Sequence, residues 1–182
     1  WTFGYVFDEQ GVPSTPFHGG FGMMADQMIP KPTLYTFAFF NNLKGECVYR
    51  DESTLVMKHP DGSYDGILWN LCRETRDLLH TRIILPEDGR WTLLTRRVDE
   101  DCCNPLEVWH DMGEPASLTK EQADFLREGA KPAYGSRVLE SEEGKVKLDL
   151  TLSENGVGHF TLVRTELKPD DGYEYQWYRN HA

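Results

Sequence analysis

The chain lacks the cysteine pattern of a disulfide-rich or zinc-binding protein. It has four cysteines in 182 residues, two of them adjacent, and no pair at the two-residue spacing typical of zinc ligands. We therefore expect Cys47, Cys72, Cys102 and Cys103 to be free thiols, as in a reducing cytoplasm, and we expect a cytoplasmic location. The six histidines are scattered along the chain. None has another at helical ligand spacing, so we expect no metal site.

Long apolar runs and an excess of positive charge are also missing. No apolar stretch approaches the roughly 20 residues that span a membrane, and no signal peptide is visible. The formal net charge is −11, whereas a nucleic-acid surface needs a basic stripe. We therefore expect neither a membrane nor a nucleic-acid partner. Apolar residues make up 39% and charged residues 27% of the sequence, as in ordinary soluble globular proteins.

The beginning of the chain has the pattern of one strand end, one functional loop and one helix. Residues 1–3 predict the end of a β-strand, and the Gly- and Pro-rich loop after it carries Asp8 and Glu9, then Phe-His-Gly-Gly-Phe-Gly at 17–22. Residues 33–43 predict an apolar helix. In a (β/α)8 barrel such loops form the active face. Because a single βα unit cannot close a barrel, we expect the chain to be the tail of a larger protein.

The helix predicted at 33–43 has a wide apolar face. The residues that form this face recur at three-residue intervals and have two aromatic neighbours: Leu34, Phe37, Phe40 and Leu43, flanked by Tyr35 and Phe39. Such a face is typical of core packing. Its natural partner would be a barrel sheet that this chain does not contain.

From residue 46 onward, short strands and turns predict an antiparallel β-sandwich. The expected strands are 47–50, 54–58, 65–70, 79–85, 91–98, 145–152 and 158–164. Asp-Gly and Asn-Gly turns predict three hairpins: 54–58 with 65–70, 79–85 with 91–98, and 145–152 with 158–164. The fold expected is thus mainly β, preceded by the barrel elements.

A helical insertion near 117–130 interrupts these strands. Thr119 followed by Gln122 is the pattern of a capping box. Phe125 and Leu126 are expected on the buried side of the helix, and Gly129 is expected to end it.

The sequence resembles the C-terminal part of glycoside hydrolase family 39 β-xylosidases. The resemblance rests on W-T-F-x-x-V-F-D-E-Q-G-V-P, F-H-G-G-F-G, I-P-K-P-T-x-Y-T-F, V-Y-R-D-E, D-G-S-x-x-G-I-L-W-N, N-P-x-x-x-W-x-x-M-G and K-E-Q-x-x-x-L-R-E-x-A-K-P. The similarity runs in order through nearly the whole chain and fades after about residue 163. It implies that residues 1–45 finish a (β/α)8 catalytic barrel and that residues 46–182 form the β-sandwich domain that follows.

The resemblance also implies an activity and a substrate site. The reaction would be retaining hydrolysis of terminal β-linked xylose from xylo-oligosaccharides, without a cofactor. The family's subsite for the non-reducing xylose is lined by a tryptophan and two acids, which correspond to Trp1, Asp8 and Glu9. The family usually has two glutamates there, and Asp8 is one methylene shorter. The family's catalytic glutamates lie on earlier barrel strands, so the resemblance implies no catalytic residue in this chain.

The positions of Asp8 and Glu9 in the sequence also make them a poor catalytic pair. A retaining glycosidase needs two carboxyl groups about 5–5.5 Å apart, and adjacent side chains in an extended loop diverge. As acceptors for sugar hydroxyls these carboxylates are well suited; as a pair without a ligand they would be a solvated loop surface. His18 is a further substrate-binding candidate, although it could instead hold the loop against the sandwich. Trp109 could be a sugar platform or a packing residue, and we expect packing.

Two other functions remain open at this point. The chain could be a non-catalytic β-sandwich module that binds sugar or mediates assembly, and a homo-oligomer is one form that such an assembly could take. Relatives such as iduronidases act on other glycosides, so the substrate could differ from xylose. The chain begins at Trp1 rather than Met, which a truncation, processing or an incomplete record would each produce. Under the family interpretation the partners are xylose or a xylo-oligosaccharide and the rest of the barrel.

Overall fold

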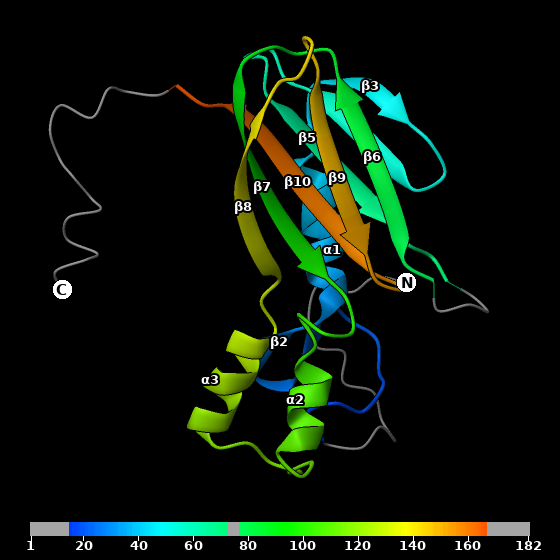
Figure 1. Ribbon diagram of the computed structural model, residues 1–182. Coiled ribbons are helices and arrows are strands. Elements are labelled where there is room, and N and C mark those ends of the chain that lie inside the picture. The colour runs from blue at the N-terminus through cyan, green and yellow to red at the C-terminus, as the bar shows by residue number, and fades with distance from the viewer. Residues whose placement is uncertain (1–14, 73–76, 167–182) are drawn as a thin grey trace, which may run out of the picture.

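The computed structural model describes residues 15–72 and 77–166. These residues form an antiparallel β-sandwich with one helix on its outer face and a helical insertion at one end (Figure 1). The mainly β architecture predicted from the sequence is therefore confirmed. No helix in these two ranges is long and apolar enough to cross a membrane.

Two sheets of unequal size make the sandwich. Within the described residues the large sheet has six strands in the order β3-β4-β5-β10-β7-β8, and the small sheet pairs β6 with β9. The strands of the large sheet are β3 (Glu46–Arg50), β4 (Thr54–Lys58), β5 (Tyr64–Trp69), β7 (Arg90–Val98), β8 (Ala133–Glu140) and β10 (Val157–Arg164). Those of the small sheet are β6 (Leu79–Leu85) and β9 (Val146–Leu152).

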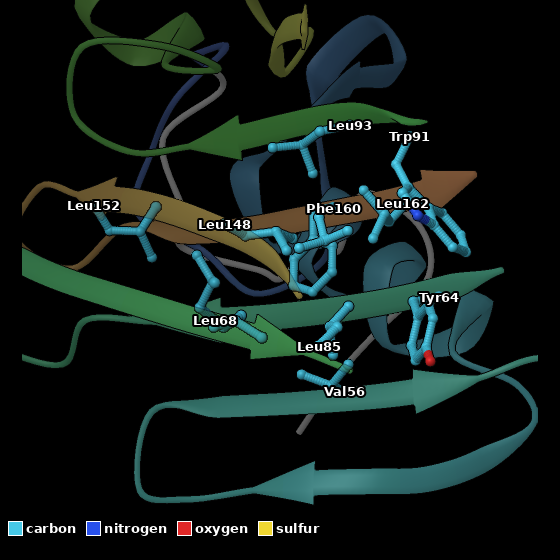
Figure 2. Packing of buried hydrophobic residues seen from close by; sticks show 12 residues of the cluster. Val56, Tyr64, Leu68, Leu85, Trp91, Leu93, Leu148, Leu152, Phe160 and Leu162 are labelled. Atoms are coloured by element: carbon cyan, nitrogen blue, oxygen red, sulfur yellow. The ribbon is translucent and has the colours of Figure 1, made fainter. Parts of the chain in front are cut away.

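The main core lies between the two sheets. Phe160 and Leu162 of β10 and Trp91 of β7 face Leu148 of β9 and Leu85 of β6, and all are buried (Figure 2). Burying a side chain of this size stabilises the fold by roughly 1.5–3 kcal/mol. The core therefore follows directly from the alternating apolar residues of these strands.

The alternation predicted for β9 is confirmed. Val146 and Leu148 are fully buried, whereas Lys147 and Asp149 between them are exposed. A strand with this period of two can bury only one face, which fixes the direction in which β9 faces the core.

The predicted hairpin of β4 and β5 is confirmed, and the other two predicted hairpins are wrong. β6 pairs with β9, while β7 pairs with β8 and β10. The turn at 86–89 therefore carries the chain from the small sheet to the large one, and the turn at 153–156 does the same between β9 and β10. Turn chemistry is correctly predicted, since Gly89 and Asn155 adopt positive φ. A turn predicts that the chain reverses direction. It does not predict whether the two strands that it joins pair in one sheet or lie in opposite sheets across the core.

Helix α1 (Pro32–Asn42) covers the outer face of the large sheet. The predicted apolar stripe is wrong in detail: Phe37 and Phe40 are 51% and 45% exposed. The face that packs consists instead of Tyr35, Phe39 and Leu43, at four-residue spacing, with only Phe39 fully buried. The sheet decides which face of the helix is covered, and this neighbour cannot be seen from the helix sequence alone.

A short element precedes α1 and two helices form the insertion. β1 (Met24–Ala25) and β2 (Ile29–Pro30) form a small ladder around the 3₁₀ turn η1 (Asp26–Met28). The insertion contains α2 (Pro105–Asp111) and α3 (Lys120–Gly129). Since α2 was not predicted, the insertion begins near 105 rather than near 117.

The capping box of α3 is confirmed. Thr119 Oγ1 accepts from the Gln122 N–H at 3.2 Å, and Gln122 Oε1 accepts from the Thr119 N–H at 2.9 Å. Leu126 is buried as expected, but Phe125 is 59% exposed. Phe125 lies about 100° from Leu126 around the helix, and the packed face continues through Ala123 and Ala130 instead.

Candidate functional site

Three of the four predicted site residues, Trp1, Asp8 and Glu9, lie outside the described residues. The fourth, His18, lies in the described loop at 17–22. The described part of the candidate site therefore consists of this loop and the elements that it contacts.

The loop at 17–22 is shaped by its glycines. Gly19 and Gly22 have φ values of +73° and +99°, a region that glycine adopts without steric cost. His18 Nδ1 accepts a hydrogen bond from the Gly20 N–H at 3.1 Å. A Cβ on Gly20 would lie 2.2 Å from Cε1 of His18. Glycine at position 20 is thus required for the His18 ring to stay where the loop holds it.

Lys31 fastens this loop to the beginning of α1. Its Nζ donates to the carbonyl oxygens of Gly20 and Phe21 at 2.9 and 3.4 Å. Partial burial lowers the pKa of Lys31. We did not predict a role for Lys31 from the sequence. The signal available was its position directly before the proline that begins α1, where its side chain faces back toward the loop.

The loop meets the sandwich domain through the helical insertion. The ring of Phe17 lies 5.7 Å from that of Trp109 in α2. Trp109 is 7% exposed, and its Nε1 donates to the Pro115 carbonyl at 3.1 Å. The prediction that Trp109 packs is therefore confirmed, because nearly all of the residue is buried, and only a small part of it borders the neighbouring cleft. His110 beside it is partly exposed and lies 2.7 Å from Glu114 Oε1.

A cleft of about 560 Å³ opens between the loop, the beginning of α1 and the beginning of α2. Its lining includes Gly20, Lys31, Thr33, Asn104, Leu106 and His110. Its volume is in the range of small-molecule sites, which combine apolar walls with a few polar groups. None of the described residues that line the cleft is Asp or Glu. The cleft can therefore position a polar ligand, but by itself it lacks the pair of carboxyl groups that glycoside hydrolysis needs.

The beginning of α2 contributes a second feature that sequence reasoning missed. Asn104 caps the helix by accepting from the Glu107 N–H at 3.4 Å, and Pro105 occupies the first turn. An Asn-Pro pair is a recognisable helix start. Its approach to the loop at 17–22, more than eighty residues earlier, depends on the tertiary fold.

The described part of the chain contains no metal-binding cluster, and one of its cysteines is buried. No group of three or more His, Cys, Asp or Glu side chains there could hold a metal ion. Cys103 is buried and its Sγ donates to the Ala130 carbonyl at 2.8 Å. Burial raises the pKa of Cys103 to about 12, so its reactive thiolate form is scarce at neutral pH.

A polar cluster lies beneath α1 on the large sheet. Asp65 accepts from Thr161 Oγ1 at 2.6 Å and lies 2.8 Å from His59 Nε2. His159 Nε2 is 3.8 Å from Asp65, and neither ring nitrogen of His159 has a hydrogen-bond partner among the described residues. Its ring packs 5.3 Å from that of Phe39. Burial lowers the pKa of His159, so this histidine is a neutral packing residue at neutral pH.

Comparison with known proteins gives consistent results. The sequence model described as "Glycosyl hydrolases family 39" matches residues 1–147. The chain is 35% identical over 178 residues to a β-xylosidase of Geobacillus stearothermophilus, a match that covers 96% of this chain and 34% of that protein.

Solved structures agree with this similarity. The GH39 enzyme from Xanthomonas axonopodis pv. citri matches with a TM-score of 0.76 and 26% identity, over 91% of this chain and 36% of that one. A GH39 β-xylosidase from Caulobacter crescentus matches with a TM-score of 0.69 and 28% identity, over 89% and 34%. The chain thus spans about a third of the length of the relatives that it matches.

Proposed function

Because the chain belongs to glycosyl hydrolase family 39, we propose that it is the C-terminal portion of a retaining β-xylosidase that removes terminal xylose from xylo-oligosaccharides. The observation that carries this proposal is the 35% identity over 178 residues to a protein named a β-xylosidase. A second β-xylosidase, from Caldicellulosiruptor saccharolyticus, is also 35% identical, over 136 residues. The proposed substrate rests on the similarity to these two β-xylosidases.

In this proposal, residues 1–45 complete a (β/α)8 barrel and residues 46–182 form the sandwich domain, with a helical insertion at 105–130. The exposed face of α1 supports the division. Phe39 is buried against the sandwich, whereas Phe37 and Phe40 remain half exposed. Covering each of those rings would contribute up to roughly 1.5–3 kcal/mol. The rest of the barrel would supply that cover.

The substrate contacts would come from the loop that precedes the cleft. Asp8 and Glu9 would accept hydrogen bonds from xylose hydroxyls, since an ionised carboxylate is an acceptor with two oxygens. Trp1 would line the same subsite. The bonds of His18 and Lys31 hold the following segment of this loop in place, and the cleft beside it would extend the sugar-binding surface. The two catalytic glutamates would belong to the part of the barrel that this chain does not contain.

A sandwich module without catalytic activity is the competing function. Its support is the complete core between the two sheets, which does not depend on residues 1–45. The two functions differ in one respect that can be measured: only the enzyme requires Glu9 for turnover.

The test is Glu9→Ala in the complete protein that contains this chain. Hydrogen bonds to a charged group contribute roughly 1.5–3 kcal/mol. If they form in the transition state, their loss lowers kcat/KM by about 10- to 150-fold. Asp8→Ala should cost less because of its shorter reach. Glu52→Ala, which removes an exposed carboxylate between β3 and β4, is the matched control. A Glu9→Ala effect within about twofold would refute the substrate-site assignment.

A further inference from the structure

A second hollow lies on the outer face of the large sheet, which faces away from the sandwich core, and runs along the side of α1. It has a volume of about 700 Å³. Its floor is the outer face of β7 and β8, with Leu94, Arg96, Tyr134 and Ser136, and its wall is the side of α1 that carries Tyr35. Among the described strands, β8 lies at the edge of the large sheet (Figure 1). We refer to this hollow as the flank groove.

The flank groove is positively charged in a strongly acidic chain. The only charged side chains among its described lining residues are Arg96 and Lys131. Neither takes part in an ion pair within residues 15–72 and 77–166. By contrast Arg97, the next residue of β7, pairs with Asp99 at 2.8 Å. In a chain with a net charge of −11, two cations that line one hollow and have no ion-pair partner among the described residues favour an anionic ligand.

Tyr134 adds an aromatic surface to these two charges. Its side chain is 91% exposed, although it lies in a strand. Tyr134 is directly opposite Arg96 in the β7–β8 ladder, and side chains in such pairs are immediate neighbours. The two side chains therefore start from paired positions on the same face of the sheet, and the exposed Tyr134 ring contributes nothing to the core. An exposed aromatic face attracts polarised C–H groups, and these cover the faces of a pyranose ring.

We propose that the flank groove binds an oligosaccharide that carries a carboxylate group. Tyr134 stacks on a sugar ring, Arg96 and Lys131 pair with the carboxylate, and the hydroxyl and amide groups of Ser136, Tyr35 and Asn42 bond to sugar hydroxyls. Arg is well suited to this role because its planar group binds a carboxylate through two parallel hydrogen bonds. An acidic peptide fits less well, because it would bind through the unpaired edge of β8 and not through side chains inside the groove.

The test compares an acidic disaccharide of glucuronate and xylose with neutral xylobiose, by titration calorimetry on the chain. We expect the acidic sugar to bind at least fivefold more tightly, and we expect this preference to weaken in high salt. Arg96→Gln and Lys131→Gln should each reduce the preference, and Tyr134→Ala should weaken the binding of both sugars. Lys120→Gln, at an exposed position on α3, is the matched control and should change neither.

Three results would overturn the proposal. The first is equal affinity for the acidic and the neutral sugar. The second is a preference that survives both Arg96→Gln and Lys131→Gln in variants with an unchanged thermal midpoint. The third is tighter binding of an acidic peptide than of the acidic sugar. Glu9→Ala separates this site from the proposed xylose subsite, because it should leave binding of the acidic sugar in the flank groove unchanged.

Discussion

Replacing Trp109 with alanine should release the loop at 17–22 from the helical insertion. Trp109 is buried against Leu126 and Ile29 and packs on Phe17. Truncating a buried tryptophan typically costs about 3–5 kcal/mol, because it removes apolar contact and leaves a cavity. Because Trp109 is only 7% exposed, we expect Trp109→Ala to lower the free energy of unfolding by an amount within this range. Such a loss is a large share of the stability of an ordinary domain.

The contact between Phe17 and Trp109 can be isolated with a double-mutant cycle. Aromatic pairs contribute about 0.5–1.5 kcal/mol beyond their buried area. Phe17→Leu and Trp109→Ala should therefore be non-additive by about that amount, because the second change removes a contact that the first has already lost.

The assay is urea unfolding followed by circular dichroism, for the two single variants and the double variant. Phe125→Ala is the control: it is an aromatic truncation in the same insertion, but at an exposed position, and should change the free energy of unfolding by no more than about 0.5 kcal/mol. A Trp109→Ala cost below about 1 kcal/mol would refute the packing argument. Additivity of the two changes within about 0.5 kcal/mol would show that the insertion does not hold the loop.

Two further predictions concern buried titratable groups. Burial lowers the pKa of His159, an effect that Asp65 opposes and Arg96 reinforces. Below about pH 6.5, His159 therefore binds a proton more readily in the unfolded state than in the folded state. The free energy of unfolding should fall as the pH drops through this range. Urea midpoints at about pH 5 and about pH 7.5 should show this fall, and His159→Phe should reduce it; an identical pH dependence in the variant would contradict the assignment. All four cysteines should titrate as thiols under denaturing, non-reducing conditions. In the native protein Cys103 should react last, because burial raises its pKa to about 12; finding two or fewer thiols would argue against a reducing location.

Local periodicity was enough to predict most strands. β4 and β6 begin and end at the predicted residues. The turn residues on either side of each segment mark where the strand ends. Thr119 and Gln122 likewise predict the start of α3 through a purely local bond pattern. These features depend on neighbours within a few residues, so the sequence contains them explicitly.

Features that depend on distant neighbours could not be predicted in this way. β8 was missed because most of its residues are exposed on both faces, which leaves no alternation to detect. The buried face of α1 is selected by Ile67 and Val98 of the sheet. For the same reason the sequence could mark the glycine-rich loop as a candidate site, whereas its hydrogen bonds to Lys31 and its contact with Trp109 required the fold.

The most direct test of the central proposal is the release of nitrophenol from a nitrophenyl β-xyloside. It should be measured with the purified chain alone and with the complete protein that contains it. A retaining mechanism needs two carboxyl groups about 5–5.5 Å apart, and we propose that both lie outside this chain. The chain alone should therefore give no release above a buffer blank and a mock purification, whereas the complete protein should turn the substrate over. Clear turnover by the chain alone, or none by the complete protein, would contradict the proposal.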